Sequence, residues 1–123
     1  MTSDNEILDA LKGKRELELS VKGRVTGKVI PRPVWFVLSK DEKSIFLIPV
    51  SGRKTQWYLN VKKEPEVTVR VGGRAFKGRI AELGPAKFKE ALDGFKARYG
   101  ERDMKDYYPN LDVALEVPLP ARS

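Results

Sequence analysis

A basic turn followed by two aromatic residues is the part of this chain best suited to chemistry. Residues 51–60 read Ser-Gly-Arg-Lys-Thr-Gln-Trp-Tyr-Leu-Asn, so two adjacent cations lead into an aromatic helical turn. Backbone N–H groups at a helix start, an Arg fork and a Lys point charge all bind phosphate well. A lone Arg-Lys pair is more often a solvated turn, but the Ser-Gly before it and the aromatic residues after it favour phosphate binding. The predicted phosphate site consists of Ser51, Arg53, Lys54 and Thr55.

Four aromatic residues are candidates for covering a flat ligand. Trp57 and Tyr58 are neighbours on a helical turn, where adjacent residues point about 100° apart, so one belongs to the core and the other forms a wall of the site. The sequence does not show which of the two is the core residue, so both are kept as candidates, Trp57 for cofactor binding and Tyr58 for substrate binding. Tyr107 and Tyr108 are substrate-pocket candidates because a phenol can donate a hydrogen bond, although an aromatic patch packed against the fold explains them equally well.

The composition excludes most other kinds of catalytic site. The 123 residues include no Cys and no His, so there is no thiolate nucleophile, imidazole base or imidazole metal ligand. Acidic residues such as Asp103 and Asp106 lie in a polar stretch and complete neither a metal site nor a glycosidase pair. We therefore predict no catalytic side chain and no metal site. An enzyme of this composition needs a coenzyme to supply the reactive group.

Positive charge is concentrated in the middle of the chain. Residues 22–79 carry 14 Lys and Arg against 4 Asp and Glu, within a net charge of +7 for the whole chain. Such a field attracts an anion, which can be a nucleotide, a polyanionic coenzyme or a nucleic-acid backbone. The length suits a single domain over residues 1–123. No segment approaches the roughly 20 apolar residues of a membrane span, so we expect a soluble cytoplasmic protein.

Hairpins dominate the elements that must position these residues. Polar and apolar residues alternate in residues 16–21 and on both sides of Gly72-Gly73, as in half-buried strands. Residues 34–38 are apolar on both faces and follow Pro31 and Pro33, which predicts a central strand starting near Val34. It forms a hairpin with residues 44–50 that leads to the basic turn. Six strands are expected, at residues 16–21, 34–38, 44–50, 67–71, 74–80 and 112–117.

Helical segments complete the predicted fold. Ser3 and Glu6 form a capping box before a short helix that reaches Lys12. A helical turn is expected at residues 55–63, and an amphipathic helix near residues 85–99 places Phe88, Phe95 and Tyr99 in the core. Because hairpins dominate and no regular βαβ alternation occurs, we predict a mainly β (α+β) fold, a six-stranded antiparallel barrel with helices at its rim.

Four segments together resemble the FMN-binding split-barrel superfamily, over roughly residues 15–118. They are Gly23-Arg24-Val25-Thr26-Gly27, Arg32-Pro33-Val34-Trp35-Phe36, the run from Gly52-Arg53-Lys54 to Trp57-Tyr58-Leu59-Asn60, and residues 67–73. The Trp-Tyr-Leu-Asn run is most similar to the deazaflavin (F-420)-dependent nitroreductase family. The pyridoxamine-phosphate oxidase branch, which holds the FMN phosphate with a similar basic turn, is the second choice, so the coenzyme is either FMN or F-420.

The resemblance also implies a second wall of the cofactor site, made by Arg24, Thr26, Lys28 and Arg32. The backbone of residues 33–35, Pro33, Val34 and Trp35, would run along the tricyclic ring with Trp35 on the substrate side. Judged from its residue type alone, Trp35 is more often a core residue, and its neighbour Phe36 is our choice for the core. The family usually has Arg-Lys-Ser-Gly where Arg24-Val25-Thr26-Gly27 stands, and an Arg where Ile30 stands. Lys28 and Arg32 are placed to compensate.

The implied function is hydride transfer between the bound coenzyme and a small organic acceptor, which the resemblance makes a nitroaromatic, quinone or enone-like compound. Barrels of this superfamily commonly dimerise, so a homodimer is expected. A non-catalytic flavin carrier or sensor is one alternative. The other is a basic barrel that binds single-stranded nucleic acid, with Trp35, Trp57 and Tyr58 stacking on bases. The cations cluster at two turns instead of following exposed strands, which disfavours nucleic acid.

Overall fold

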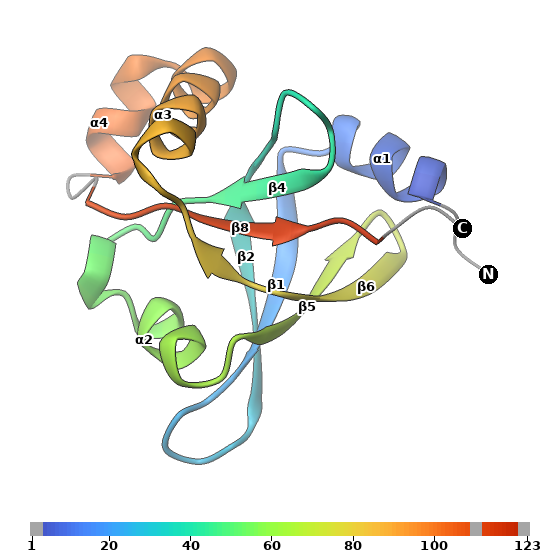
Figure 1. Ribbon diagram of the computed structural model, residues 1–123, viewed down its shortest axis with the longest axis vertical. Helices are drawn as coiled ribbons and strands as arrows, with labels where there is room; N and C mark the ends of the chain where they lie inside the picture. Colours follow the sequence, from blue (N-terminus) through green and yellow to red (C-terminus); the bar gives the residue numbers. More distant parts are fainter. Residues whose placement is uncertain (1–3, 109–111, 121–123) are drawn as a thin grey trace.

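Two antiparallel four-stranded sheets form the centre of the structure, a computed structural model that describes residues 4–108 and 112–120. The first sheet has the strand order β2-β1-β5-β6 and the second β3-β4-β8-β7. Figure 1 shows the two sheets crossing, with α2, α3 and α4 towards one end and α1 at the other. The strands are β1 Glu16–Lys22, β2 Val29–Trp35, β3 Val37–Leu38, β4 Ser44–Leu47, β5 Glu66–Val71, β6 Arg74–Arg79, β7 Ala81–Glu82 and β8 Leu115–Pro118.

The helices fall largely where the sequence predicts them. They are α1 Asp4–Lys12, the 3₁₀ turn η1 Gly52–Lys54, α2 Gln56–Lys63, α3 Pro85–Tyr99 and α4 Glu101–Tyr107. The predictions of α1, α2 and α3 are confirmed. Ser3 of the expected capping box lies outside the described residues. The polar stretch after Gly100 was not expected to be helical, yet it forms α4 and buries Met104. None of the helices in the described ranges is long and apolar enough to span a membrane.

The expected count of six strands is wrong, because the described residues form eight. Neither β2 nor β7 was predicted. Pro31 and Pro33 lie within β2, where they pair with Ser20 and Glu18 of β1. The strand is at the edge of its sheet, where a missing N–H group on the open side costs no ladder hydrogen bond. The prolines therefore occupy an edge strand and do not mark the entry of a central one.

The apolar run of residues 34–38 passes from one sheet to the other. β2 ends at Trp35, β3 begins at Val37, and Phe36 between them is fully buried. Val37 pairs with Phe46 in the second sheet. The run is apolar on both faces because it contributes to the core on both sides of this crossing, so the expected single strand is in fact two short pieces.

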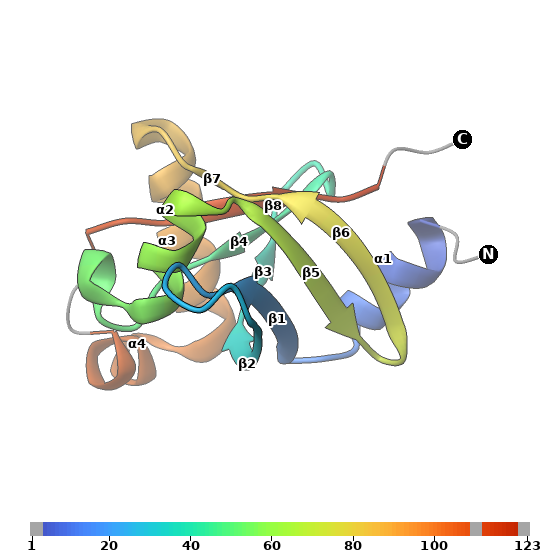
Figure 2. The ribbon, with the colours of Figure 1, turned by 90° about the horizontal axis from the view of Figure 1, so that it is seen from below.

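Two groups of buried residues fill the space around the sheets. Leu17, Leu19 and Val21 of β1 face inward, as their alternation predicts, and pack between the sheets. Phe95 and Tyr99 of α3 pack with Phe46 on the outer side of the second sheet. Figure 2, seen from below, shows α3 and α4 gathered at the end of the molecule opposite α1. This arrangement brings the end of β2, the start of α2 and the end of α4 to the same end of the molecule.

Candidate functional site

A cavity of about 550 Å³ lies among the end of β2, the start of β1, the segment after β4 and the start of α2. This volume is within the range of small-molecule and cofactor sites. Seven of its ten lining residues are among those predicted for cofactor or substrate, and they come from three separate segments. The lining residues are Glu16, Arg32, Pro33, Val34, Trp35, Ile48, Val50, Thr55, Trp57 and Tyr108.

Trp35 forms an aromatic wall of this cavity. Its ring is half-buried and stacks on Tyr99, with 4.2 Å between centroids and 7° between planes. Tyr108 approaches the same ring at 5.9 Å and 52°. Trp35 therefore has both roles that the sequence left open: it packs against the core, and it lines the cavity. A flat apolar ligand suits such a wall.

Tyr108 places a polar group inside this apolar surrounding. The residue is only 4% exposed, and within the described part of the chain its hydroxyl group has no hydrogen-bond partner. Burial raises the pKa of this phenol, and Tyr99 and Glu16 raise it further. The hydroxyl group is therefore protonated at neutral pH and can donate a hydrogen bond to a ligand. The side chain of Tyr107, the other candidate of this pair, lies outside the described part of the structure.

The basic turn does not reach the cavity in the way the sequence suggested. Ser51, Arg53 and Lys54 are absent from the cavity lining, and the backbone N–H groups of all three already have acceptors in the protein. The Lys54 N–H donates to the Ser51 carbonyl oxygen at 3.3 Å. The Ser51 N–H donates to the Thr55 hydroxyl at 2.8 Å, and the Arg53 N–H donates to Asp112 at 3.1 Å. Thr55, which closes the turn, is the member that lines the cavity.

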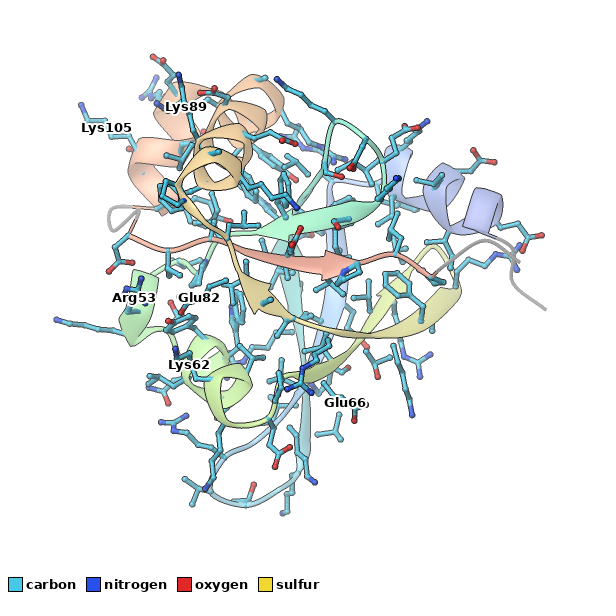
Figure 3. The ribbon with its side chains drawn as sticks, viewed as in Figure 1. Arg53, Lys62, Glu66, Glu82, Lys89 and Lys105 are labelled. Carbon is cyan, nitrogen blue, oxygen red and sulfur yellow. The ribbon has the colours of Figure 1, made fainter. Side chains whose placement is uncertain are left out.

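The side chain of Arg53 points into a cluster of charged and polar groups beside α2. It donates to the Tyr58 hydroxyl at 2.8 Å and to Glu82 at 3.2 Å, and Tyr58 itself donates to Glu82. Figure 3 shows Arg53, Lys62 and Glu82 converging there. The hydrogen bond from Tyr58 lowers the pKa of Glu82, and Lys62 and Arg53 add to this. Tyr58 is buried and lies outside the cavity lining, so the structure does not bring it to the predicted substrate pocket.

Arg24, Thr26 and Lys28 lie in the turn between β1 and β2, at the opposite end of β2 from Trp35. The Arg24 guanidinium donates to Asn60 at 2.7 Å and to Gln56 at 3.0 Å. Asn60, the last residue of the Trp-Tyr-Leu-Asn run, is buried and also accepts the Arg24 backbone N–H. Arg24 thus fixes the turn to α2, and none of the three predicted residues lines the cavity.

The start of α2 is the feature of the cavity most suited to an anion. Thr55 occupies the N-cap position without a side-chain capping hydrogen bond, and the first turn of α2 contains no acidic residue. The first N–H groups of a helix have no partner within it and carry the positive end of its dipole. Arg32 lines the same cavity, so a phosphate here would meet backbone donors and one cation.

Three lining residues were not predicted from the sequence. Glu16 was missed because the hairpin of β1 and β2 was missed; in that hairpin it lies directly opposite Trp35. Ile48 and Val50 follow β4 and were expected to be strand residues. A larger cavity of about 820 Å³ lies among α1, β4 and β8, but its lining has no aromatic side chain and no predicted site residue. Within the described residues, no cluster of three His, Cys, Asp or Glu could hold a metal ion.

Comparisons with known proteins give a family for the chain and a fold that it shares with solved structures. A family model described as F420H(2)-dependent quinone reductase matches residues 1–114, and no curated protein sequence gives a significant match. The solved F420-H2 dependent reductase FDR-A is 18% identical with a TM-score of 0.63, covering 85% of this chain and 94% of that one.

Two further solved structures share the fold. A FAD-binding protein from Mesorhizobium loti is 19% identical with a TM-score of 0.67, covering 98% of this chain and 91% of its own. The heme storage protein HutZ from Vibrio cholerae is 14% identical with a TM-score of 0.73, covering 100% and 93%. At such identities these likenesses establish a common fold and leave the ligand of this chain to be argued from its cavity.

Proposed function

Because the chain belongs to the F420H(2)-dependent quinone reductase family, we propose that it is a deazaflavin-dependent oxidoreductase that reduces a quinone. The membership confirms the resemblance to the deazaflavin branch that the Trp-Tyr-Leu-Asn run indicated. When bound, coenzyme F-420 supplies a hydride, and the hydride together with one proton converts a quinone to its hydroquinone. A quinone is one of the three acceptor classes that the sequence resemblance implies; FMN stays the alternative coenzyme.

The observation that carries the proposal is the cavity that gathers residues 32–35, Thr55, Trp57 and Tyr108. Its surface is mostly apolar and aromatic, which suits a tricyclic ring, and the start of α2 with Arg32 suits a phosphate group. In this proposal the backbone of residues 33–35 runs along the ring, and Trp57 closes the opposite side. The protein orients the coenzyme and keeps water from it, while the coenzyme carries the chemistry.

The acceptor would lie beside Trp35 and Tyr108. The buried Tyr108 hydroxyl group, which has no partner among the described residues, is placed to donate a hydrogen bond to a quinone oxygen. Such a donor stabilises the negative charge that develops on that oxygen as the hydride arrives.

The basic turn keeps a role in the proposal at the edge of the site. Lys54 lies two residues before the first residue of α2, and Arg53 could reach a phosphate only by exchanging its contacts with Glu82 and Tyr58. Ser51 is the third member of this turn. Arg24, Thr26 and Lys28 lie in the β1–β2 turn beside α2, outside the cavity lining, and the two cations of this turn are proposed to act through the field they create.

Titration of the protein with F-420 and, in parallel, with FMN tests the coenzyme assignment, with Trp fluorescence as the signal. We expect saturable binding of F-420, weakened at least tenfold in Trp35→Leu and less in Arg53→Ala/Lys54→Ala. The control is Lys89→Gln/Lys105→Gln, which removes two positive charges on α3 and α4 away from the Arg53 cluster (Figure 3). Tighter binding of FMN would transfer the chain to the FMN-binding branch. Saturation by neither coenzyme would overturn the proposal.

The proposal further includes a single flavin-binding domain over residues 1–123, a homodimer and a cytoplasmic location. The support for the homodimer is the resemblance to split barrels that commonly dimerise. Sedimentation analysis with and without coenzyme tests it: a mass of about twice the 13.9 kDa chain is expected, and a monomer in both conditions would contradict it.

A further inference from the structure

Tyr99, the last residue of α3, combines a ring stack with hydrogen bonds between its hydroxyl group and two backbone segments beside the cavity. Its ring stacks on Trp35, yet Tyr99 itself is absent from the cavity lining. Its hydroxyl group lies 2.7 Å from the Arg15 carbonyl oxygen and 2.8 Å from that of Phe36. The Phe36 N–H donates back to the same hydroxyl group at 3.2 Å.

The hydrogen bonds can be assigned individually. A phenol has one proton to donate, and the Phe36 carbonyl already accepts the Arg98 guanidinium at 3.2 Å. The Tyr99 hydroxyl group can therefore donate to the Arg15 carbonyl oxygen while it accepts from the Phe36 N–H group. Arg98 also donates to the Lys14 carbonyl oxygen. The end of α3 thus holds the backbone just before β1 and just after β2.

These two backbone points flank the cavity. Glu16 and Trp35 are direct partners in the β1–β2 ladder and both line the cavity; Arg15 and Phe36 are their chain neighbours. Phe36 is also where the chain leaves the first sheet for the second, so this backbone lacks ladder hydrogen bonds that would otherwise fix it. Gly100, with φ of 88°, ends α3 immediately after Tyr99, in a conformation that favours glycine.

We propose that Tyr99 is a positioning residue: it fixes the orientation of the Trp35 ring, and through it the width of the aromatic cavity that takes the coenzyme or acceptor ring. The ring of Tyr99 orients Trp35, and the hydroxyl group adds stability by joining the end of α3 to the backbone at Arg15 and Phe36. The inference rests on the proposed function for the identity of the ligand, but the orientation of Trp35 can be measured without any ligand.

The test uses Trp57→Phe as background, because the chain has two Trp residues and this change leaves Trp35 as the single one. Near-UV circular dichroism and acrylamide quenching then report on Trp35 in the ligand-free protein. We expect Tyr99→Leu to alter the Trp35 dichroism band and raise its quenching constant at least twofold. Tyr99→Phe keeps the stack and should retain the band while lowering the melting temperature. Tyr99→Met, long and non-aromatic, is the second variant if Tyr99→Leu does not fold.

The ligand readout separates positioning from general loss of stability. We expect Tyr99→Leu to weaken F-420 binding about tenfold and Tyr99→Phe less than threefold. The control is Leu92→Ala, which removes packing of the same helix against the same buried cluster, at a residue that does not itself line the cavity. It should lower the melting temperature and leave Trp35 and the binding unchanged.

An unchanged Trp35 band and quenching constant in Tyr99→Leu would overturn the inference, as would an equal loss of binding in Leu92→Ala. If the parent protein binds neither F-420 nor FMN, the proposed function fails. The ligand-free spectra still decide whether Tyr99 orients Trp35.

Discussion

Among single residues, the buried hydroxyl groups of Tyr108 and Tyr58 differ in their hydrogen bonding. The Tyr108 hydroxyl group is buried without a hydrogen-bond partner in the described ranges, which costs about 1–3 kcal/mol unless a ligand accepts from it. Tyr58 is equally buried, but its hydroxyl group donates to Glu82 and accepts from Arg53. The first arrangement leaves a donor for a ligand, whereas the second is complete within the protein.

Tyr108→Phe should therefore separate catalysis from folding. The variant loses the donor to the acceptor oxygen, and one hydrogen bond corresponds to about a three- to tenfold loss in kcat/KM for a quinone. Its thermal stability should be unchanged or slightly higher, because the buried group had no partner. Steady-state kinetics and thermal unfolding check both parts; an unchanged kcat/KM would show that the hydroxyl group does not contact the acceptor.

Glu82→Gln tests the Arg53 cluster through pH. The pKa of Glu82 is lowered in the folded protein, so the carboxylate stabilises the fold above its ordinary pKa near 4.5, and this contribution is lost as pH falls through the lowered folded value. Because the Glu82 side chain is 33% exposed, we expect about 1 kcal/mol or less at pH 7. Denaturant unfolding should show the difference between parent and variant shrinking towards zero in acid. A difference independent of pH would contradict the assignment.

Among the elements, the two sheets lie close together where β6 meets β8. Gly78 of β6 has no room for a side chain, since a Cβ atom there would lie 2.6 Å from the Val117 Cγ1 of β8. The absence of a side chain at this position lets the sheets close on each other and bury the core between them.

Gly78→Ala should lower the free energy of unfolding by about 1–3 kcal/mol through overpacking. Gly13→Ala, where the nearest atom would be at 3.5 Å, is the control and should change stability by less than about 0.5 kcal/mol. Addition of Val117→Ala to Gly78→Ala should cost less than the sum of the two single changes, because they share one contact. Full additivity in a denaturant double-mutant cycle would argue against this close approach.

The elements also show what the sequence could and could not predict. Hydrophobic periodicity and turn residues were enough to predict β1, the β5–β6 hairpin, α2 and α3, because the pattern that indicates each element lies within its own residues. β2 was missed because its prolines disfavour a strand unless it is known to lie at a sheet edge. α4 was missed because its polar composition hides one buried residue, Met104.

The residues of the candidate site could likewise be predicted only in part. Residues 32–35 and Thr55, Trp57 and Tyr108 could be chosen by type and by resemblance, and the fold gathers them. The partners of Arg24 and Arg53 could not be chosen, since Asn60, Gln56 and Glu82 meet them only through tertiary packing. Glu16 required the register of a hairpin that the sequence did not predict.

At the scale of the whole molecule, the net charge of +7 and the basic middle segment attract anions in general. Part of any observed binding will therefore be non-specific, and salt separates it from a cavity. Charges at the surface are screened over about 10 Å at 0.1 M salt, whereas buried contacts are screened much less.

A single-stranded oligonucleotide should accordingly bind weakly and lose its affinity steeply between 50 and 200 mM salt, roughly as counterion release predicts. Binding of F-420 should change less than about threefold over the same range, because much of it rests on ring stacking. Fluorescence titrations at several salt concentrations check this. Tight oligonucleotide binding at 200 mM salt would favour a nucleic-acid function instead.

Quinone reduction is tested directly by mixing the protein with reduced F-420 and a water-soluble quinone and following oxidation of the coenzyme and formation of the hydroquinone. We expect one hydroquinone per coenzyme oxidised, a rate that saturates in both substrates, and a loss of at least tenfold in kcat/KM in Trp35→Leu. Coenzyme that binds but is oxidised by no quinone faster than in free solution would contradict the proposed function and indicate a carrier or sensor.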